Sequence, residues 1–150
     1  MGQLTPLLAG KLVAFDTGPL IYYIEEHPDY LSPADELFRA FDSGAAQGMT
    51  SVLTLQEVLV KPLREGREDI ADKYRQVLSN SANVSLYDVD QSTCETAARL
   101  RAKYRWVRTP DALQLATAIR HDAQVLVTND DRWRTISEVV VVLLKDFARP

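Results

Sequence analysis

Short apolar runs and longer amphipathic stretches alternate along the whole chain. A run of four to six residues with a continuous or alternating apolar pattern indicates a β-strand, and apolar residues at a spacing of three to four indicate a helix. The predicted strands are residues 12–15, 49–53, 84–89, 125–128 and 139–143. The predicted helices are residues 19–26, 32–44, 53–66, 69–78 and 92–104, and a stretch that begins at Thr109.

Turn and capping residues mark the borders of these elements. Residues 17–19 (TGP) break the first strand and start a helix, and Ser32 opens the next helix. Asp90 is placed to cap the helix over 92–104. Residues 109–111 (TPD) put Thr at the cap, Pro at the first helical position and an acid near the positive helix end. These signals support the helix positions predicted from spacing.

Strands separated by helices predict an α/β fold with a mainly parallel sheet covered on both faces. The chain has 150 residues and 46% hydrophobic content, which suits one compact domain with its own core. It contains no repeat, low-complexity segment or flexible linker. We therefore expect a single domain over residues 1–150.

Charge and cysteine content narrow the functional classes. A net charge of -4 and a pI near 5.2 argue against a protein that coats nucleic acid non-specifically. The single cysteine, Cys94, excludes an intramolecular disulfide and a zinc site built from paired thiolates, so a cytoplasmic location is expected. The longest apolar run, residues 139–144, is too short to span a bilayer and is expected to be a buried strand.

Four carboxylates stand beside apolar runs that end strands or start helices. These acids are Asp16, Glu57, Asp111 and Asp130. Strand ends and helix starts of an α/β chain face a common crevice, where distant carboxylates can converge on a hard divalent cation. The pattern indicates metal-assisted chemistry, and a phosphodiester is the expected substrate.

Each acid also has a purely structural interpretation. Asp16 is placed to cap the following helix, and Asp111 is placed to improve the dipole of its own helix. Glu57 lies among apolar neighbours, so its carboxylate is either exposed to solvent or held inward by a metal. Asp130 has an adjacent competitor in Asp131, and the tripeptide alone does not choose between them.

Other polar residues near these acids are candidates for a supporting role. Thr17, Thr128 and Asn129 can hydrogen-bond a carboxylate or a bound water, although such residues are more often turn and cap residues. The two histidines, His27 and His121, are too isolated in sequence to indicate a catalytic pair.

A basic segment precedes the helix that starts at Thr109. It contains no acid, and Trp106 lies inside it. Its basic residues are Arg99, Arg101, Lys103, Arg105 and Arg108. Such a segment can follow a single-stranded RNA backbone and stack a base. The alternative is a solvated helix face with Trp106 packed inward.

Four motifs occur in a fixed order along the chain: FDTGPLIYY, TSVLTLQEV, TPDALQLATAI and VTNDDRW. Each is weak alone, but together they cover nearly the full length. In this order and spacing the chain resembles the PIN domain family, most closely the bacterial VapC-type toxin ribonucleases.

The resemblance implies a three-layer α/β/α fold and a carboxylate cluster that holds Mg²⁺ or Mn²⁺. By motif, the four family acids fall in order on Asp16, Glu57, Asp111 and Asp130, and the pattern favours Asp130 over Asp131. A divalent ion suits the chemistry because it activates water and neutralises charge on phosphate oxygens. Carboxylates suit the ion because hard cations prefer oxygen ligands.

The function implied is a metal-dependent endoribonuclease that cleaves single-stranded or structured RNA, as the toxin of a type II toxin-antitoxin pair. The resemblance also implies a homodimer and a small antitoxin whose C-terminal segment occupies the active-site groove. The candidate contact residues are Tyr22, Tyr23, Ile24 and Tyr30, which have an alternative place in the core. Two other functions stay open: a PIN nuclease of RNA maturation or DNA processing, and a PIN-like binding module with an inert site.

Overall fold

A computed structural model describes residues 3–148, which contain a five-stranded sheet with every strand pair parallel. The spatial order is β3-β2-β1-β4-β5, which places β1 at the centre. The strands are β1 Leu12–Phe15, β2 Gln47–Ser51, β3 Val84–Tyr87, β4 Val125–Thr128 and β5 Val141–Leu143. The predicted parallel sheet is confirmed.

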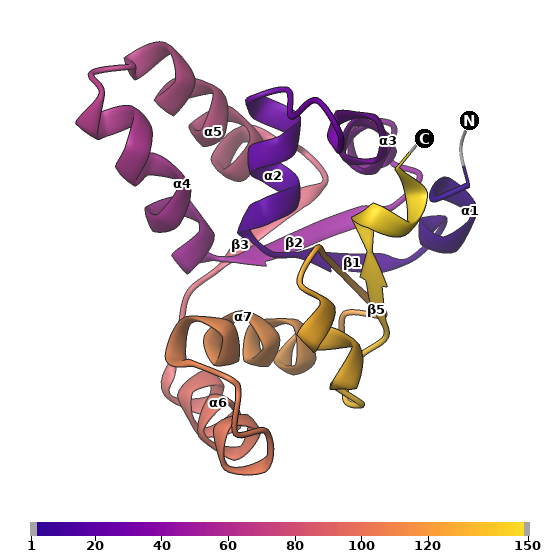
Figure 1. The fold of residues 1–150 in the computed structure, drawn as a ribbon, viewed down its shortest axis with the longest axis vertical. Helices are drawn as coiled ribbons and strands as arrows, with labels where there is room; N and C mark the ends of the chain where they lie inside the picture. The colour runs from indigo at the N-terminus through magenta and orange to yellow at the C-terminus, as the bar shows by residue number, and fades with distance from the viewer. Residues whose placement is uncertain (1–2, 149–150) are drawn as a thin grey trace.

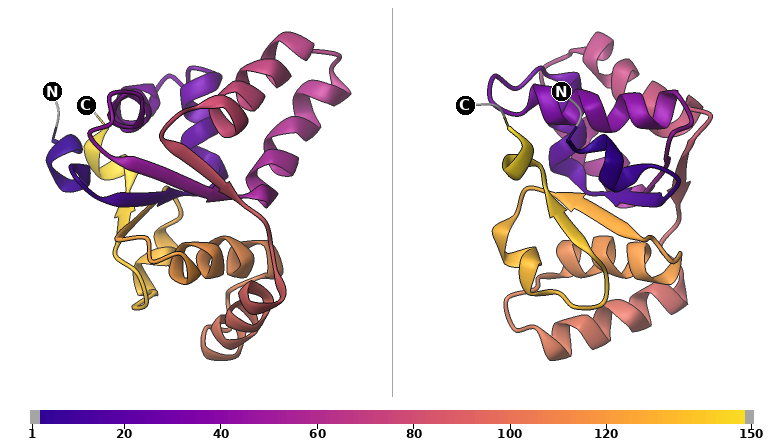
Figure 2. Two further views of the ribbon diagram at one scale, coloured as in Figure 1. Left: turned by 180° about the vertical axis from the view of Figure 1, so that it is seen from behind. Right: turned by 90° about the vertical axis from the view of Figure 1, so that its right-hand side faces the viewer.

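Helices cover both faces of the sheet, as the three-layer prediction requires (Figure 1). On one face lie α1 Thr5–Leu8, α2 Thr17–Ile24, α3 Leu31–Asp42, α4 Val52–Arg64 and α5 Glu68–Asn80. On the other face lie α6 Gln91–Lys103 and α7 Thr109–Arg120, with α7 between the sheet and α6 (Figure 2). Two short 3₁₀ helices, η1 Asp131–Thr135 and η2 Leu144–Phe147, complete the C-terminal part. Within residues 3–148 no helix has both the length and the apolar content needed to cross a membrane.

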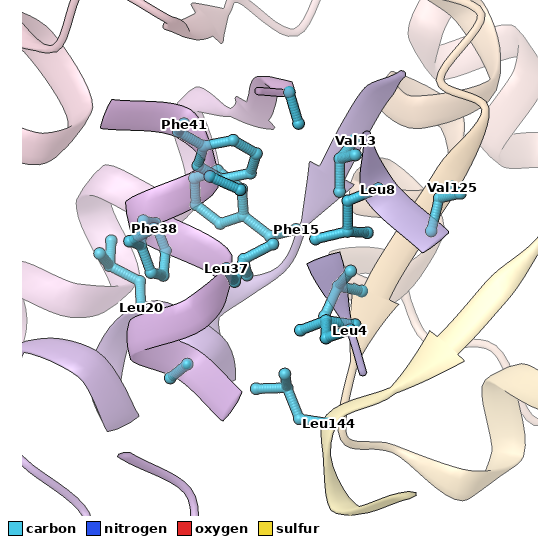
Figure 3. Close-up of a cluster of buried hydrophobic side chains, with 14 of the residues drawn as sticks. Leu4, Leu8, Val13, Phe15, Leu20, Leu37, Phe38, Phe41, Val125 and Leu144 are labelled. Atoms are coloured by element: carbon cyan, nitrogen blue, oxygen red, sulfur yellow. The ribbon is translucent and has the colours of Figure 1, made fainter. Parts of the chain in front are cut away.

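Each face of the sheet has its own hydrophobic core, and the side chains of β1 alternate between them. Phe15 enters the core beneath α2 and α3, where its ring centroid lies 5.2 Å from that of Phe38 and 5.8 Å from that of Phe41 (Figure 3). Ala14 points to the opposite core, where Leu115 of α7 is fully buried. This alternation follows from the two-residue period of a strand. The next residue, Asp16, lies at the carboxyl end of this central strand.

The border between β2 and α4 differs from the prediction. A strand over 49–53 was expected, but β2 ends at Ser51 and the helix begins at Val52. The cause is local, because the Ser51 hydroxyl accepts a hydrogen bond from the Leu53 backbone N–H at 3.1 Å and caps the helix. The helix continues through Pro62 and ends at Arg64.

Other borders shift by one to three residues. The first long helix, α2, starts at Thr17 rather than 19, and α3 starts at Leu31. Thr109 is the first residue of α7 and not its cap, since Arg108 occupies the cap position. Asp90 caps α6 as predicted, because its carboxylate accepts from the Thr93 backbone N–H at 2.8 Å.

The two chain ends contain the larger errors. The short helix α1 at Thr5–Leu8 was not predicted. The last strand covers only Val141–Leu143, and Val140 before it is 62% exposed, so the expectation of one buried strand over 139–144 was wrong. The sequence of a valine run does not show which of its residues are buried, because burial depends on the elements that pack against them.

A candidate acidic site at the ends of β1 and β4

Asp16 follows β1 directly and occupies the cap position of α2 without capping it. No side-chain hydrogen bond from Asp16 reaches the helix N-terminus. Its Oδ2 instead accepts a hydrogen bond from the Thr128 hydroxyl at 2.8 Å. Its Oδ1 is buried and has no hydrogen-bond partner among the described residues. The capping interpretation of Asp16 is therefore wrong, and one carboxylate oxygen is left available.

Burial raises the pKa of Asp16 from 3.8 to about 7. The hydrogen bond from Thr128 opposes this rise, and the negative charges of Asp111 and Asp130 add to it. Electrostatic repulsion weakens with distance, so the effect of Asp111 and Asp130 on the pKa of Asp16 indicates that the three carboxylates lie near one another. At neutral pH the Asp16 side chain is therefore divided between its protonated and ionised forms.

Asp130 follows β4, and its pKa is shifted in the opposite direction to that of Asp16. Its Oδ1 accepts from the backbone N–H and from Nε of Arg132, both at 3.0 Å, and its Oδ2 accepts from Arg132 Nη2 at 2.6 Å. These hydrogen bonds hold the pKa of Asp130 below its ordinary value. Thr128 connects this acid to the first, because the Thr128 hydroxyl oxygen also accepts from the Asp130 backbone N–H at 3.2 Å.

Asp111 lies in the first turn of α7 and completes this group. Partial burial raises its pKa, the nearby Asp130 adds to the rise, and Arg132 opposes it. Its position in the first helical turn also fits the dipole interpretation.

Glu57 is the one predicted acid that the structure does not connect to the others. It is exposed on α4 and is not among the groups that shift the pKa of Asp16 most. Within residues 3–148, no three His, Cys, Asp or Glu side chains are arranged so that they can hold a metal ion together. The donor chemistry nevertheless fits a hard divalent cation, because the site offers carboxylate oxygens and Asp16 Oδ1 has no hydrogen-bond partner in the part of the chain that the structure describes.

Two of the other predicted supporting residues, Asn129 and Asp131, line a hollow together with Asp16 and Asp130. Thr17 is the first residue of α2. Asn129 Oδ1 accepts from the Lys145 backbone N–H at 2.8 Å, and Asp131 forms an ion pair with Lys145 Nζ at 2.7 Å. Asn129 and Asp131 therefore hold η2 against the sheet end.

A buried polar network beside the site was missed at the level of sequence. The Thr50 hydroxyl donates to the Phe15 backbone carbonyl at 2.6 Å and lies 2.7 Å from the Thr54 hydroxyl, to which Gln114 Nε2 donates at 2.9 Å. The network joins the end of β1 to α4 and α7. Its signal was an amide in the apolar stretch of α7, one helical turn after Asp111.

The basic segment is partly paired with other parts of the chain. Arg99 lies 3.8 Å from Glu95 and Lys103 lies 3.0 Å from Glu138 in ion pairs. Arg101 Nε donates to the Val107 carbonyl at 3.2 Å. Arg105 and Arg108 form none of the ion pairs found among residues 3–148.

The aromatic side chains of Tyr22, Tyr23, Tyr30 and Trp106 have intermediate burial. Trp106 packs in part against the core beneath α7, in agreement with the inward alternative. Tyr22 and Tyr23 pack against the core on the other face, and the Tyr22 ring lies 5.1 Å from that of Tyr30. Tyr22 also lines a hollow together with Asp16.

Comparison with known proteins agrees with this architecture. The model of the PIN domain family matches residues 13–139. A chain of a toxin-antitoxin complex from Klebsiella pneumoniae is 25% identical, with a TM-score of 0.67, over 85% of this chain and 95% of that chain. A search of curated protein sequences gives no match.

Two further solved structures share the fold at lower identity. VapBC2 from Rickettsia felis, bound to a DNA fragment from its promoter, is 18% identical with a TM-score of 0.68, over 88% of this chain and 98% of that chain. Mycobacterium tuberculosis VapC20, described as a Sarcin-Ricin loop cleaving toxin, is 18% identical with a TM-score of 0.66, over 85% of this chain and 98% of that chain.

Proposed function

Because the chain belongs to the PIN domain family, we propose that it is a divalent-metal-dependent endoribonuclease and the toxin of a type II toxin-antitoxin pair. The observation that carries the proposal is Asp16, a buried carboxylate with one unpartnered oxygen and two further acids near enough to raise its pKa. An unsatisfied charge-bearing oxygen inside a fold is costly. A cation at this position removes the cost.

The proposed ligands of Mg²⁺ or Mn²⁺ are Asp16, Asp111 and Asp130, with Glu57 as the fourth family acid. When bound, the ion supplies Lewis-acid chemistry, namely activation of a water nucleophile and neutralisation of charge at the scissile phosphate. Glu57 lies one helical turn after Thr54 on α4, and Asp111 lies one turn before Gln114 on α7. The Thr54–Gln114 hydrogen bond thus joins the two helices that carry these acids.

The remaining residues of the site orient these acids. Thr128 donates to Asp16 Oδ2 and accepts from the Asp130 backbone, so one hydroxyl sets both acids relative to each other. We assign the RNA strand to the basic segment before α7, where Arg105 and Arg108 have no ion-pair partner among residues 3–148. Exposed guanidinium groups suit phosphate oxygens.

The partners proposed are a cognate antitoxin and a second copy of the chain. The Klebsiella pneumoniae neighbour is a toxin-antitoxin complex, which supports the antitoxin. Tyr22 lines the hollow that contains Asp16, and the partly buried Tyr23 and Ile24 follow it on α2. These three residues are the proposed contact surface. Light scattering after size exclusion tests the homodimer, and a monomer at micromolar concentration contradicts it.

Cleavage of single-stranded RNA in Mg²⁺ and in EDTA tests the nuclease directly. We expect cleavage that requires the metal, fails in Asp16→Asn and persists in Asp146→Asn, a matched control whose carboxylate forms an ion pair with Arg134. Activity that survives chelation, or that survives Asp16→Asn, contradicts the proposal. Growth arrest on expression, relieved by the product of a neighbouring gene, separates a toxin from a nuclease of RNA maturation or DNA processing.

A further inference from the structure

Arg132 places a positive charge inside the acidic site. Its guanidinium forms two parallel hydrogen bonds to the two oxygens of Asp130, at 3.0 and 2.6 Å. The guanidinium carbon also lies 5.1 Å from the centroid of the Trp106 ring. Its charge reaches Asp111 as well, since it opposes the rise in the pKa of that acid. One side chain therefore interacts with two of the proposed metal ligands.

This arrangement leaves little room for a second cation on Asp130. A carboxylate has about four acceptor positions, and three on Asp130 are taken by the backbone N–H, Nε and Nη2 of Arg132. A divalent ion bound to the same carboxylate would also be repelled by the guanidinium a few ångströms away. The two cations thus compete for one anion.

We infer that Arg132 is a resident counter-ion of the site, which releases Asp130 when a divalent cation binds and then binds a phosphate of the RNA strand. This inference rests on the proposed function and adds a role for a residue outside the four family acids. The side chain of Arg132 is half exposed, so it can leave Asp130 without disturbing a core.

The Trp106 ring would hold the Arg132 guanidinium after it leaves Asp130. A cation over an aromatic face is attracted to it, and arginine does this while its donors stay free at the edge of the plane. The planar fork that now fits a carboxylate also fits a phosphate. Arg132 would then stand at the rim of the site with its donors available to the substrate.

Calorimetric titration with Mn²⁺ alone tests the competition. We expect Arg132→Gln to bind Mn²⁺ about tenfold more tightly than the unmodified protein, because a positive charge beside the ion is removed. Arg67→Gln is the matched control, since Arg67 makes the same two-bond pair with an acid two residues away, Asp69, and is equally exposed. Its affinity for Mn²⁺ should be unchanged.

The sign of the change separates the outcomes. Equal or weaker Mn²⁺ binding by Arg132→Gln overturns the inference, because an arginine that merely orients Asp130 would help the metal to bind. Absence of Mn²⁺ binding in both proteins overturns the metal-dependent function itself, and the inference with it. Circular dichroism confirms that each variant is folded.

Steady-state cleavage of single-stranded RNA at saturating Mn²⁺ tests the phosphate role. Arg132→Gln should raise KM by about fivefold with a smaller change in kcat, as loss of a substrate contact does. An unchanged KM in this variant overturns the second half of the inference.

Discussion

Two buried polar groups lie at the carboxyl ends of neighbouring strands, and only one is fully hydrogen-bonded. After β2, the Thr54 hydroxyl is joined to Thr50 and Gln114 by hydrogen bonds of 2.7 and 2.9 Å. After β1, Asp16 has one bonded oxygen and one buried oxygen without a partner. The first group is neutral and satisfied, and the second carries a carboxylate whose pKa is raised to about 7.

The difference separates a polar group that stabilises the fold from a candidate metal ligand. Buried polar groups in native proteins are almost always hydrogen-bonded, so an exception calls for an explanation. The buried polar groups of the Thr54 network are hydrogen-bonded to one another, and they connect four elements, β1, β2, α4 and α7. Asp16 destabilises the metal-free fold whenever it is ionised, and the proposed cation would supply the missing partner. Four predictions test this contrast, and they are ordered from the largest expected effect to the smallest.

The largest effect is expected in catalysis. Asp16→Asn should lower kcat/KM for RNA cleavage by roughly a thousandfold, about 4 kcal/mol, because the charge that attracts the cation is removed. Steady-state cleavage in Mg²⁺ measures the loss. A variant with nearly full activity would place the metal elsewhere.

The same substitution should stabilise the metal-free protein at high pH. The pKa of Asp16 is raised from 3.8 to about 7, so between these values the folded state holds a proton that the unfolded state has lost. This contribution makes stability fall as pH rises through that window, by up to about 4 kcal/mol. Urea unfolding at roughly pH 4.5 and 8 measures it.

We expect the free energy of unfolding of Asp16→Asn, relative to the unmodified protein, to increase by about 3 kcal/mol from the lower to the higher pH. Taking the difference between the two proteins cancels the titration of all other groups. A difference that does not change with pH would mean that Asp16 has an ordinary pKa.

Substitution of the hydrogen-bonded Thr54 should destabilise the fold, whereas Asp16→Asn should stabilise it at high pH. Thr54→Val should destabilise the fold by about 2 kcal/mol, because the Gln114 amide and the Thr50 hydroxyl each lose a buried partner. Thr54→Ser keeps the hydroxyl and serves as the control. Urea unfolding of both variants checks this, and equal stability of Val and Thr at this position would show that the network is dispensable.

The smallest effect is expected at Glu57, which is exposed and has no burial cost to recover. Glu57→Gln should change the free energy of unfolding by less than about 0.5 kcal/mol. RNA cleavage should fall about tenfold if this acid joins the metal site. A large change in stability would show that Glu57 is held in the fold by contacts of its own.

The sequence was enough to predict the layers, the parallel sheet and the positions of Asp16, Asp111 and Asp130 near element borders, whereas Glu57 lies inside α4. Apolar period and turn residues are local, and they determine these features directly. Strand and helix borders such as Ser51–Val52 shifted because one capping hydroxyl decided them. The short helix α1 and the exposure of Val140 depend on contacts that no local pattern contains.

The candidate site could be proposed from the sequence as a list of acids and not as an arrangement. Spacing alone left Asp16 equally suited to capping, and only the geometry shows that its carboxylate is turned to Thr128. The pairing of Asp130 with Arg132, two residues away, is likewise a matter of side-chain direction. Gln114 was overlooked because the sequence does not show that its hydrogen-bond partner is the distant Thr54.

The ionisation of Asp16 tests the central claim most directly. Carbon-13 NMR of the side-chain carboxyl, followed against pH, should give a pKa of about 7 in metal-free protein. In saturating Mg²⁺ we expect the pKa to fall below about 4, since a bound divalent cation favours the carboxylate. A pKa that stays near 7 in Mg²⁺ would contradict the assignment of Asp16 as the centre of the metal site.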